Sequence, residues 1–233
     1  MGTLINAATI ILGGVLGLFL KGRLSERVNG TIMQGVGLVI LLIGLDMARQ
    51  THNAIMVLIS LVAGGIIGET LNLEGRFEDW SDRLQARFAR GESTFSRGFV
   101  AASLLFCVGP MAIMGAFDDG LRGNYQVLVN KAALDGISSI ALAASLGFGV
   151  VFSAIPVFLY QGSLTLLAVT IRPIMTPLAI AEMTATGGLM IVGLAFNMLG
   201  FRKIKVTNFL PALVLAVAIA YFWPGAMRLL GIG

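Results

Sequence analysis

The chain has 233 residues, of which 57% are hydrophobic and only 12% charged, and its mean hydropathy is +0.90. This composition excludes a water-soluble globular protein, which could not bury so much apolar surface. The net charge of +4 does not indicate nucleic-acid binding, because basic residues also gather on the cytoplasmic flanks of membrane helices.

Long apolar runs alternate with short stretches that carry most of the charges. A membrane-spanning helix needs roughly 20 mostly apolar residues. The sequence therefore predicts an all-α, polytopic integral membrane bundle of about eight helices, in a single transmembrane domain over residues 1–233. The predicted spans lie near 3–20, 31–48, 54–71, 97–117, 129–148, 151–170, 183–200 and 207–223. Between the fifth and sixth spans, Gly147 and Gly149 predict a tight turn.

Glycines recur within the predicted spans. Gly13 and Gly17 form a small-xxx-small pair in the first span, as do Gly64 and Gly68 in the third. Such pairs let helix backbones approach closely, which is the interpretation we favour. The alternative is that the Gly-Gly pairs at 13–14, 64–65 and 187–188 unwind and line a substrate site.

The polar connection at 72–96 has an apolar stripe at helical spacing. The stripe consists of Leu73, Phe77, Trp80, Leu84 and Phe88. It predicts an amphipathic helix on the cytoplasmic membrane surface, with Trp80 at the level of the headgroups. A helix packed against the cytosolic ends of the bundle is an equal alternative.

Several acidic residues near the ends of the spans fall towards one side of the membrane. They are Asp46, Asp118, Asp119, Asp135 and Glu182, and they suggest a vestibule that attracts cations. Lys131 and Asp135 are four residues apart and share a helix face, which Ser138 and Ser139 continue inwards. The alternative is that these acids cap helix ends or pair with nearby basic residues. We favour that alternative for Asp118 and Asp119 and leave it open for Asp135 and Glu182.

Uncharged polar residues also occur within the spans or at their ends. Asn6 lies in the first span and Gln161 in the sixth, where an interhelical hydrogen bond is the expected role. Asn197 lies near the cytoplasmic end of the seventh span and completes the candidate substrate- or ion-binding residues. Those residues are Asp135, Glu182, Asp119, Lys131, Ser138, Asp46, Asn6 and Asn197.

The basic residues predict the orientation. The connections after the first, third and seventh spans carry Lys21, Arg23, Arg27, Arg76, Arg83, Arg87, Arg90, Arg97, Arg202, Lys203 and Lys205. The opposite side carries only Arg49, Arg122, Lys131, Arg172 and Arg228. The first set is therefore expected in the cytoplasm, with both termini outside.

A shift of 151 residues aligns the first three spans with the last three and brings Asp46 onto Asn197. Five spans separate the two starts, so the triplets would be antiparallel, as in the inverted repeats of many transporters. Chance similarity between two apolar helices is the alternative, and we weigh the two about equally.

The chain has few of the residues and motifs that soluble enzymes use to bind metals or nucleotides. His52 is the only histidine and Cys107 the only cysteine, so no metal set of His and Cys is expected, and no Gly-rich loop precedes Lys-Ser or Lys-Thr. We therefore expect no cofactor and no enzymatic activity.

Several motifs along the whole chain resemble the YqgA/YdfK-type family (DUF554) of bacterial multi-pass membrane proteins, a family of unknown function. They are residues 2–6, the run 109–115 with Asp119-Gly120, Lys131 with 135–139, and the stretches 153–156, 160–162 and 187–189. Pro110 and Asp118 depart from the usual pattern. The resemblance implies a bacterial inner-membrane location but no substrate.

Two functions remain. The first is a transporter or channel for a cation or small solute, with a site between helices. The second is a membrane scaffold or assembly protein without transport activity. The lipid bilayer and a small cation or solute are the expected partners, and the sequence leaves open whether the chain forms a homo-oligomer.

Overall fold

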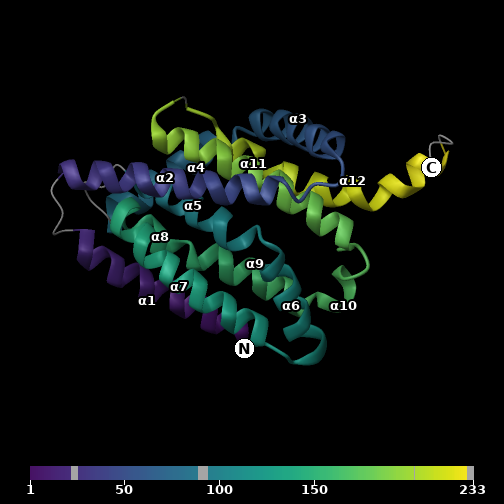
Figure 1. Ribbon diagram of the computed structural model, residues 1–233, viewed down its shortest axis with the longest axis horizontal. Helices are drawn as coiled ribbons and strands as arrows, with labels where there is room; N and C mark the ends of the chain where they lie inside the picture. Colours follow the sequence, from purple (N-terminus) through teal and green to yellow (C-terminus); the bar gives the residue numbers. More distant parts are fainter. Residues whose placement is uncertain (22–25, 89–93, 202, 230–233) are drawn as a thin grey trace.

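The computed structural model describes residues 1–21, 26–88, 94–201 and 203–229, and every regular element in these ranges is a helix (Figure 1). The helices are α1 (Gly2–Lys21), α2 (Glu26–Ala48), α3 (Ala54–Thr70), α4 (Leu73–Phe88), α5 (Phe95–Cys107), α6 (Pro110–Arg122), α7 (Gln126–Leu146), α8 (Gly149–Phe152), α9 (Ala154–Leu166), α10 (Ala168–Ile171), α11 (Pro177–Leu199), the 3₁₀ helix η1 (Val206–Phe209) and α12 (Leu210–Leu229).

Within the described residues, six helical segments are long and apolar enough to cross a membrane. Two further pairs of helices qualify together, each bent at a short break, and raise the number of spans to eight. The prediction of an all-α, multi-pass bundle is therefore confirmed, and eight spans is the upper limit.

One predicted span, 97–117, is wrong as a single straight helix. It is divided into α5 and α6, which meet at an angle of 57°. Gly109 has an extended backbone (φ −138°, ψ 150°) and Pro110 begins α6. Proline lacks an amide hydrogen and disfavours helical geometry in the residue before it, so α5 cannot continue through this point.

Two other boundaries differ from those expected. The run 151–170 is interrupted and forms α8, α9 and α10, and the span expected at 183–200 begins at Pro177 instead. Thr176 caps that earlier start, because its hydroxyl accepts a hydrogen bond from the Ala179 amide. The tight turn predicted between the fifth and sixth spans is confirmed, with Gly147 at φ 81°.

Close backbone approaches hold the helix pairs together. A Cβ atom on Gly13 would lie 2.2 Å from the Gly136 carbonyl oxygen of α7, and one on Gly68 would lie 1.8 Å from the Asn208 carbonyl oxygen of η1. Gly17 and Gly64 make similar approaches to α7 and α12. The close-packing interpretation of the glycine pairs is therefore confirmed.

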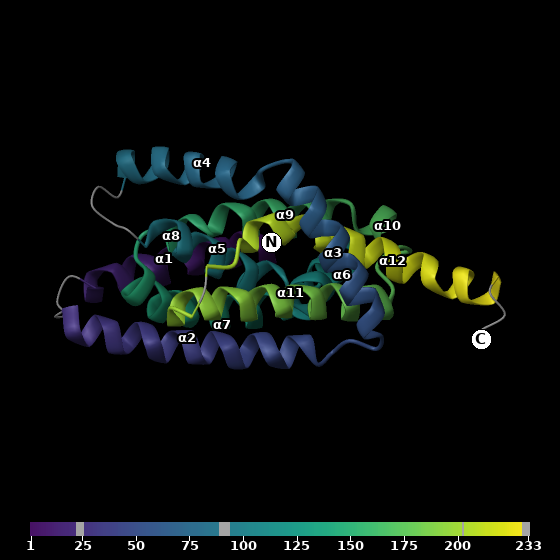
Figure 2. The ribbon, with the colours of Figure 1, turned by 90° about the horizontal axis from the view of Figure 1, so that it is seen from above.

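The long helices are arranged along the longest axis of the molecule. Figures 1 and 2 show α2 beside α11, and α12 extending past the bundle to the C-terminal end. The end of α1, the start of α2 and the end of α4 lie at one end of the bundle (Figure 2). The α2–α3 and α10–α11 connections lie towards the other. This distribution of helix ends and connections agrees with successive spans that cross the membrane in alternating directions.

The predicted repeat pairs helices that are in contact in the fold, since α2 packs on α11 and α3 on α12. Contact between related helices does not by itself demonstrate an internal symmetry. The inverted repeat stays a prediction.

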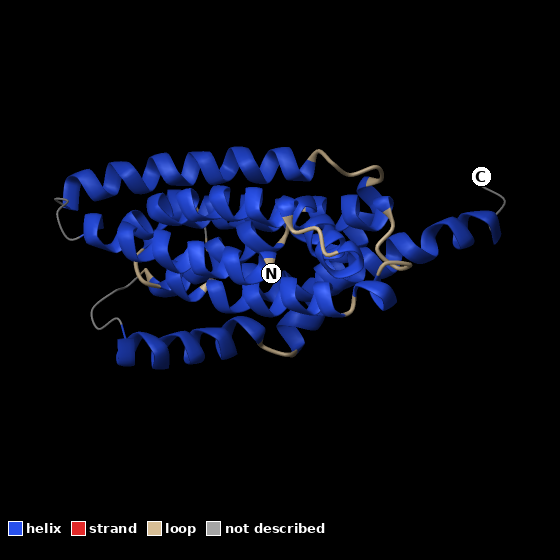
Figure 3. Cartoon of the chain, turned by 90° about the horizontal axis from the view of Figure 1, so that it is seen from below, coloured by secondary structure: helices blue, strands red, loops and turns tan. Residues whose placement is uncertain are grey.

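The polar connection forms α4, bent by 59° from α3 and lying along the flank of the bundle (Figure 3). The rings of Phe77 and Trp80 lie 5.3 and 5.1 Å from the ring of Phe99 in α5. These two residues of the stripe therefore pack on the protein, which supports the alternative of a helix held by the bundle. The side chains of Leu84 and Phe88, and the part of the segment at 89–93, lie outside what the structure describes.

A substitution at the α1–α7 contact tests the role of the glycines. Gly13→Ala should lower the stability of the protein by about 1–3 kcal/mol, because the added methyl group overlaps the backbone of α7. The matched control is Gly35→Ala in α2, where no described atom beyond the neighbouring backbone of the same helix lies within 4 Å of the added Cβ. Thermal unfolding of the purified variants in detergent measures both, and equal melting midpoints would show that the contact is not tight.

Candidate functional site

A cluster of buried polar side chains lies where α1, α7 and α9 meet. Lys131 and Asp135 of α7 form an ion pair, and Asn6 of α1 donates a hydrogen bond to Asp135 Oδ2 over 3.0 Å. The same Asn6 amide donates to Gln161 Oε1 of α9 over 3.2 Å. The structure thus connects three helices through one asparagine.

The local sequence explains how these residues meet. Lys131 and Asp135 are one helical turn apart, so they share a face of α7. Asn6 and Gly13 are seven residues apart, about two turns, and so lie on one face of α1. The close approach of Gly13 to Gly136 fixes the distance between α1 and α7 and brings Asn6 within hydrogen-bonding distance of Asp135.

The two charges are almost completely removed from solvent. Lys131 is 5% exposed and Asp135 is 7% exposed, while Asn6 and Gln161 are fully buried. The ammonium group of Lys131 also lies 5.7 Å from the centre of the Phe106 ring, which favours a cation. A charged side chain within an apolar bundle is costly unless it is paired, so each member of the pair stabilises the other.

The cluster has unused hydrogen-bonding capacity. Among the described residues, Asn6 Oδ1, Gln161 Nε2 and Ser139 Oγ are buried and have no hydrogen-bond partner. Most buried polar atoms in proteins are paired, and unpaired ones call for an explanation such as a bound molecule. The cluster therefore offers one amide acceptor and one amide donor beside a neutralised ion pair.

Two other predicted acids, Asp118 and Asp119, have partners of their own. Asp119 accepts hydrogen bonds from the amide of Gly2 and the amino group of Met1, both over 3.1 Å. Asp118 pairs with Arg122 and accepts a hydrogen bond from Asn124, in agreement with a local role. Asp46 is exposed on α2, and Ser138 is half-buried beside the cluster on α7.

Glu182 of α11 holds the connection between α2 and α3. Its fully buried carboxylate accepts hydrogen bonds from the Thr51 hydroxyl and the His52 amide, each over 2.7 Å, and from the Asn53 amide over 3.1 Å. Asn53 in turn caps α3 by accepting a hydrogen bond from the Ile55 amide. The arrangement satisfies the carboxylate locally and does not bring Glu182 to Asp135.

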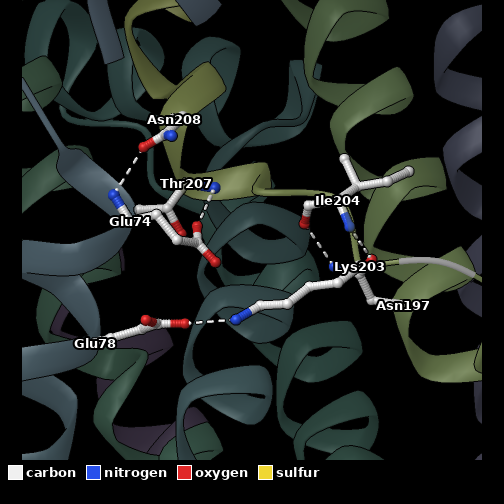
Figure 4. A network of polar contacts seen from close by, with 7 residues as sticks. All are labelled: Glu74, Glu78, Asn197, Lys203, Ile204, Thr207 and Asn208. Atoms are coloured by element: carbon white, nitrogen blue, oxygen red, sulfur yellow. Dashed lines mark hydrogen bonds and ion pairs between the residues drawn. The ribbon is translucent and has the colours of Figure 1, made fainter. Parts of the chain in front are cut away.

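Asn197 belongs to a second polar network, at the connection between α11 and η1 (Figure 4). Its side chain donates to the Ile204 carbonyl over 2.8 Å and accepts from the Ile204 amide over 2.6 Å. It therefore closes the turn after α11, rather than joining the Lys131–Asp135 pair.

The same network joins α4 to η1. Asn208 accepts a hydrogen bond from the Glu74 amide over 2.7 Å, and Glu74 accepts one from the Thr207 amide over 3.1 Å, so each side chain caps the other helix (Figure 4). Glu78 pairs with Lys203 over 2.8 Å, and this hydrogen bond raises the pKa of the Lys203 ammonium group. The contacts between α4 and the η1 region are not evident from the sequence, because their partners are more than a hundred residues apart.

Of the predicted site residues, the structure brings together Asn6, Lys131 and Asp135, with Ser138 nearby on α7. Gln161, which was expected only to make an interhelical hydrogen bond, does so with Asn6 and becomes the fourth member of the cluster. No group of three or more His, Cys, Asp or Glu side chains that could hold a metal ion occurs in the described ranges.

Comparison with known proteins gives relatives over almost the whole chain. A family profile described as "Protein of unknown function (DUF554)" matches residues 1–221. "Uncharacterized membrane protein YdfK" of Bacillus subtilis (strain 168) is 32% identical over 224 residues, which cover 94% of this chain and 95% of that protein. "Uncharacterized protein YqgA" of Escherichia coli (strain K12) is 32% identical over 228 residues, which cover 96% and 97%. No solved structure matches the chain.

The contacts of Glu182 predict a structural effect of its substitution. Glu182→Gln should lower the stability by about 1–3 kcal/mol, because the new amide group faces three donors and cannot accept all of their hydrogen bonds. Thermal unfolding and proteolysis of the α2–α3 connection measure the loss. Asp118→Asn, which removes a carboxylate from an exposed ion pair, is the control. A Glu182→Gln variant as stable as this control would contradict the structural role.

Proposed function

The chain belongs to the DUF554 family, and we propose from its buried polar cluster that it is a transporter or channel for a small polar solute or cation, and not an enzyme. The binding site is the cluster of Asn6, Lys131, Asp135 and Gln161. The observation that carries this proposal is the pair of buried amide atoms, one acceptor and one donor, that have no partner among the described residues.

The chemistry of the cluster favours a solute that can both donate and accept hydrogen bonds. The acceptor Asn6 Oδ1 and the donor Gln161 Nε2 come from different helices, so a bound solute would link α1 to α9. Asp135 is already neutralised by Lys131, so a bare cation would have to displace the ammonium group to reach the carboxylate. A small molecule with both a hydrogen-bond donor and an acceptor can bind to the two amide atoms without displacing the Lys131 ammonium group.

The break between α5 and α6 supplies an element that can move. It lies beside the cluster, because Phe106 at the end of α5 contacts Lys131. Val108 at the break packs on Gly187 of α11, where a Cβ atom would lie only 2.1 Å from Val108 Cγ1. A rotation of α6 about this joint would change access to Lys131 and Asp135 while α7 keeps the two charges together.

We also propose a bacterial inner-membrane location, with the basic connections in the cytoplasm and both termini outside. Reporter fusions after residues 90 and 204 should then read as cytoplasmic, and fusions near residue 125 and at the C-terminus as external, because cytoplasmic loops carry the excess of Lys and Arg. A cytoplasmic C-terminus together with an external N-terminus would mean an odd number of spans, and it would contradict both this orientation and the antiparallel repeat.

Flux into proteoliposomes tests the transport role, with a panel of alkali cations and amino acids as probes. Gln161→Met keeps the ion pair and approximately the side-chain volume but removes the amide, so flux should fall about tenfold while folding is retained. The double variant Asp135→Asn with Lys131→Met removes both charges together and should likewise fold and lose flux. Asp118→Asn is the control and should transport as the wild type does.

The single variant Asp135→Asn separates a structural role from a transport role. It leaves Lys131 buried and unpaired, which should cost about 3–5 kcal/mol of stability. If the second change at Lys131 restored both stability and flux, Asp135 would have no part in transport. If proteoliposomes that contain the wild-type protein show no flux for any probe, the proposed function is rejected in favour of a scaffold.

A further inference from the structure

Two further buried hydroxyl groups adjoin the polar cluster, on Thr3 of α1 and Thr165 of α9. Neither has a hydrogen-bond partner among the described residues. Thr3 precedes Asn6 by three residues and Thr165 follows Gln161 by four, so each lies one turn beyond the hydrogen bond that joins α1 to α9. Gly14, three turns after Thr3 and therefore on the same face of α1, packs against α8, which leads into α9. Thr3 thus lies on the face of α1 that packs on α8 and α9.

Two adjacent residues of α6 close this region at the end of the bundle where α1 begins, which we call the outer end. The Asp119 carboxylate accepts a hydrogen bond from the Gly2 amide of α1 over 3.1 Å. A Cβ atom on Gly120 would lie 2.2 Å from the Thr165 carbonyl oxygen of α9. Because α6 ends at Arg122, both contacts are made by its last turn. This turn therefore joins α1 to α9 directly beyond the two hydroxyl groups.

The layer between the cluster and the outer end is thin. Asn6 lies four residues from Gly2, which is about 6 Å along α1 at a rise of 1.5 Å per residue. The side chain of Asp119 is 7% exposed, and Gly120 is exposed at the surface. The helix that covers the region begins at the break after Gly109, so α6 can tilt without a change in α1 or α9.

We propose that the last turn of α6 is the outer gate of the polar cluster, and that Thr3 and Thr165 bind the solute as it enters. When α6 tilts away, its contacts with Gly2 and Thr165 separate and the two hydroxyls are uncovered. A hydroxyl group both donates and accepts hydrogen bonds, so these residues select the same class of solute as the cluster, a small polar molecule with a donor and an acceptor. The gate rests on the proposed transport function.

Cysteine labelling in nanodiscs, where both membrane faces are accessible, tests the gate. The reporters are Thr3→Cys and Thr165→Cys in a Cys107→Ala background, and the probe is 2-(trimethylammonium)ethyl methanethiosulfonate, whose charge keeps it out of hydrocarbon. Gly120→Ala adds a methyl group that overlaps the α9 backbone and favours the open gate, so both reporters should be labelled about tenfold faster. The matched control is Gly162→Ala in α9, where no described atom beyond the neighbouring backbone of the same helix lies within 4 Å of the added Cβ. It should leave both rates unchanged.

A second pair of variants examines the other contact of the gate. Asp119→Ala removes the hydrogen bond to Gly2 and should also accelerate labelling. Asp118→Ala should not, because the side-chain partners of Asp118 lie within α6 and the turn after it. A third reporter, Ser145→Cys, is fully buried near the opposite end of α7 and should not respond to Gly120→Ala.

The binding role of the hydroxyls is tested by flux into proteoliposomes. Thr3→Val and Thr165→Val keep the side-chain shape and should each raise the KM for the transported probe about fivefold, the effect of one lost hydrogen bond. A wild-type KM in both variants would overturn this binding role.

The two measurements separate the gate from the transport function. Labelling of Thr3→Cys and Thr165→Cys that is unaffected by Gly120→Ala and Asp119→Ala would overturn the gate, even if the wild-type protein transports a probe. Equal acceleration at Ser145→Cys would overturn it as well, because the whole bundle would then have loosened. Accelerated labelling at the two threonine positions alone, without wild-type flux for any probe, would support the movement of α6 and reject transport.

Discussion

A lysine and an aspartate, each less than a tenth exposed, can persist in an apolar bundle only as a pair. The alternative, a single buried charge, would cost several kcal/mol, so the two side chains must lie on one face of α7, as their spacing of four residues allows. Side chains from neighbouring helices stabilise this pair. Asn6 donates to the carboxylate, Gln161 holds Asn6, and the ring of Phe106 lies near the ammonium group.

Small residues make these contacts possible. Apolar side chains gain little from burial when the alternative is lipid, so helices associate through close packing and a few hydrogen bonds. Gly13 and Gly17 bring α1 against the backbone of α7, and Gly120 of α6 approaches the Thr165 carbonyl of α9 in the same way. A methyl group at Gly13 or Gly17 would separate α1 from α7, and the Asn6 amide would then no longer reach Asp135 at 3.0 Å.

The sequence was sufficient to predict features that depend on neighbouring residues. Hydropathy gave the multi-pass helical class, helical spacing put Lys131 and Asp135 on one face, and the glycine pairs indicated close packing. Partners distant in the chain could not be found in this way. Nothing local to Glu182 indicates that it binds the amides of His52 and Asn53, which are 130 and 129 residues away. The break at Gly109-Pro110 is a different case, because its signal was present but was outweighed by the apolar run around it.

The fold also separates two environments with a single layer of side chains. On α5, Phe106 contacts Lys131, while its neighbour Cys107 lines an apolar cavity of about 890 Å³ between α5, α9, α11 and α12. On α9, Gln161 bonds to Asn6 while its neighbour Tyr160 lines the same cavity. Adjacent residues in a helix point about 100° apart, so each of these helices can present one residue to the charges and the next to hydrocarbon. The ion pair is therefore separated from the cavity by α5 and α9, and a displacement of either helix would change the surroundings of both.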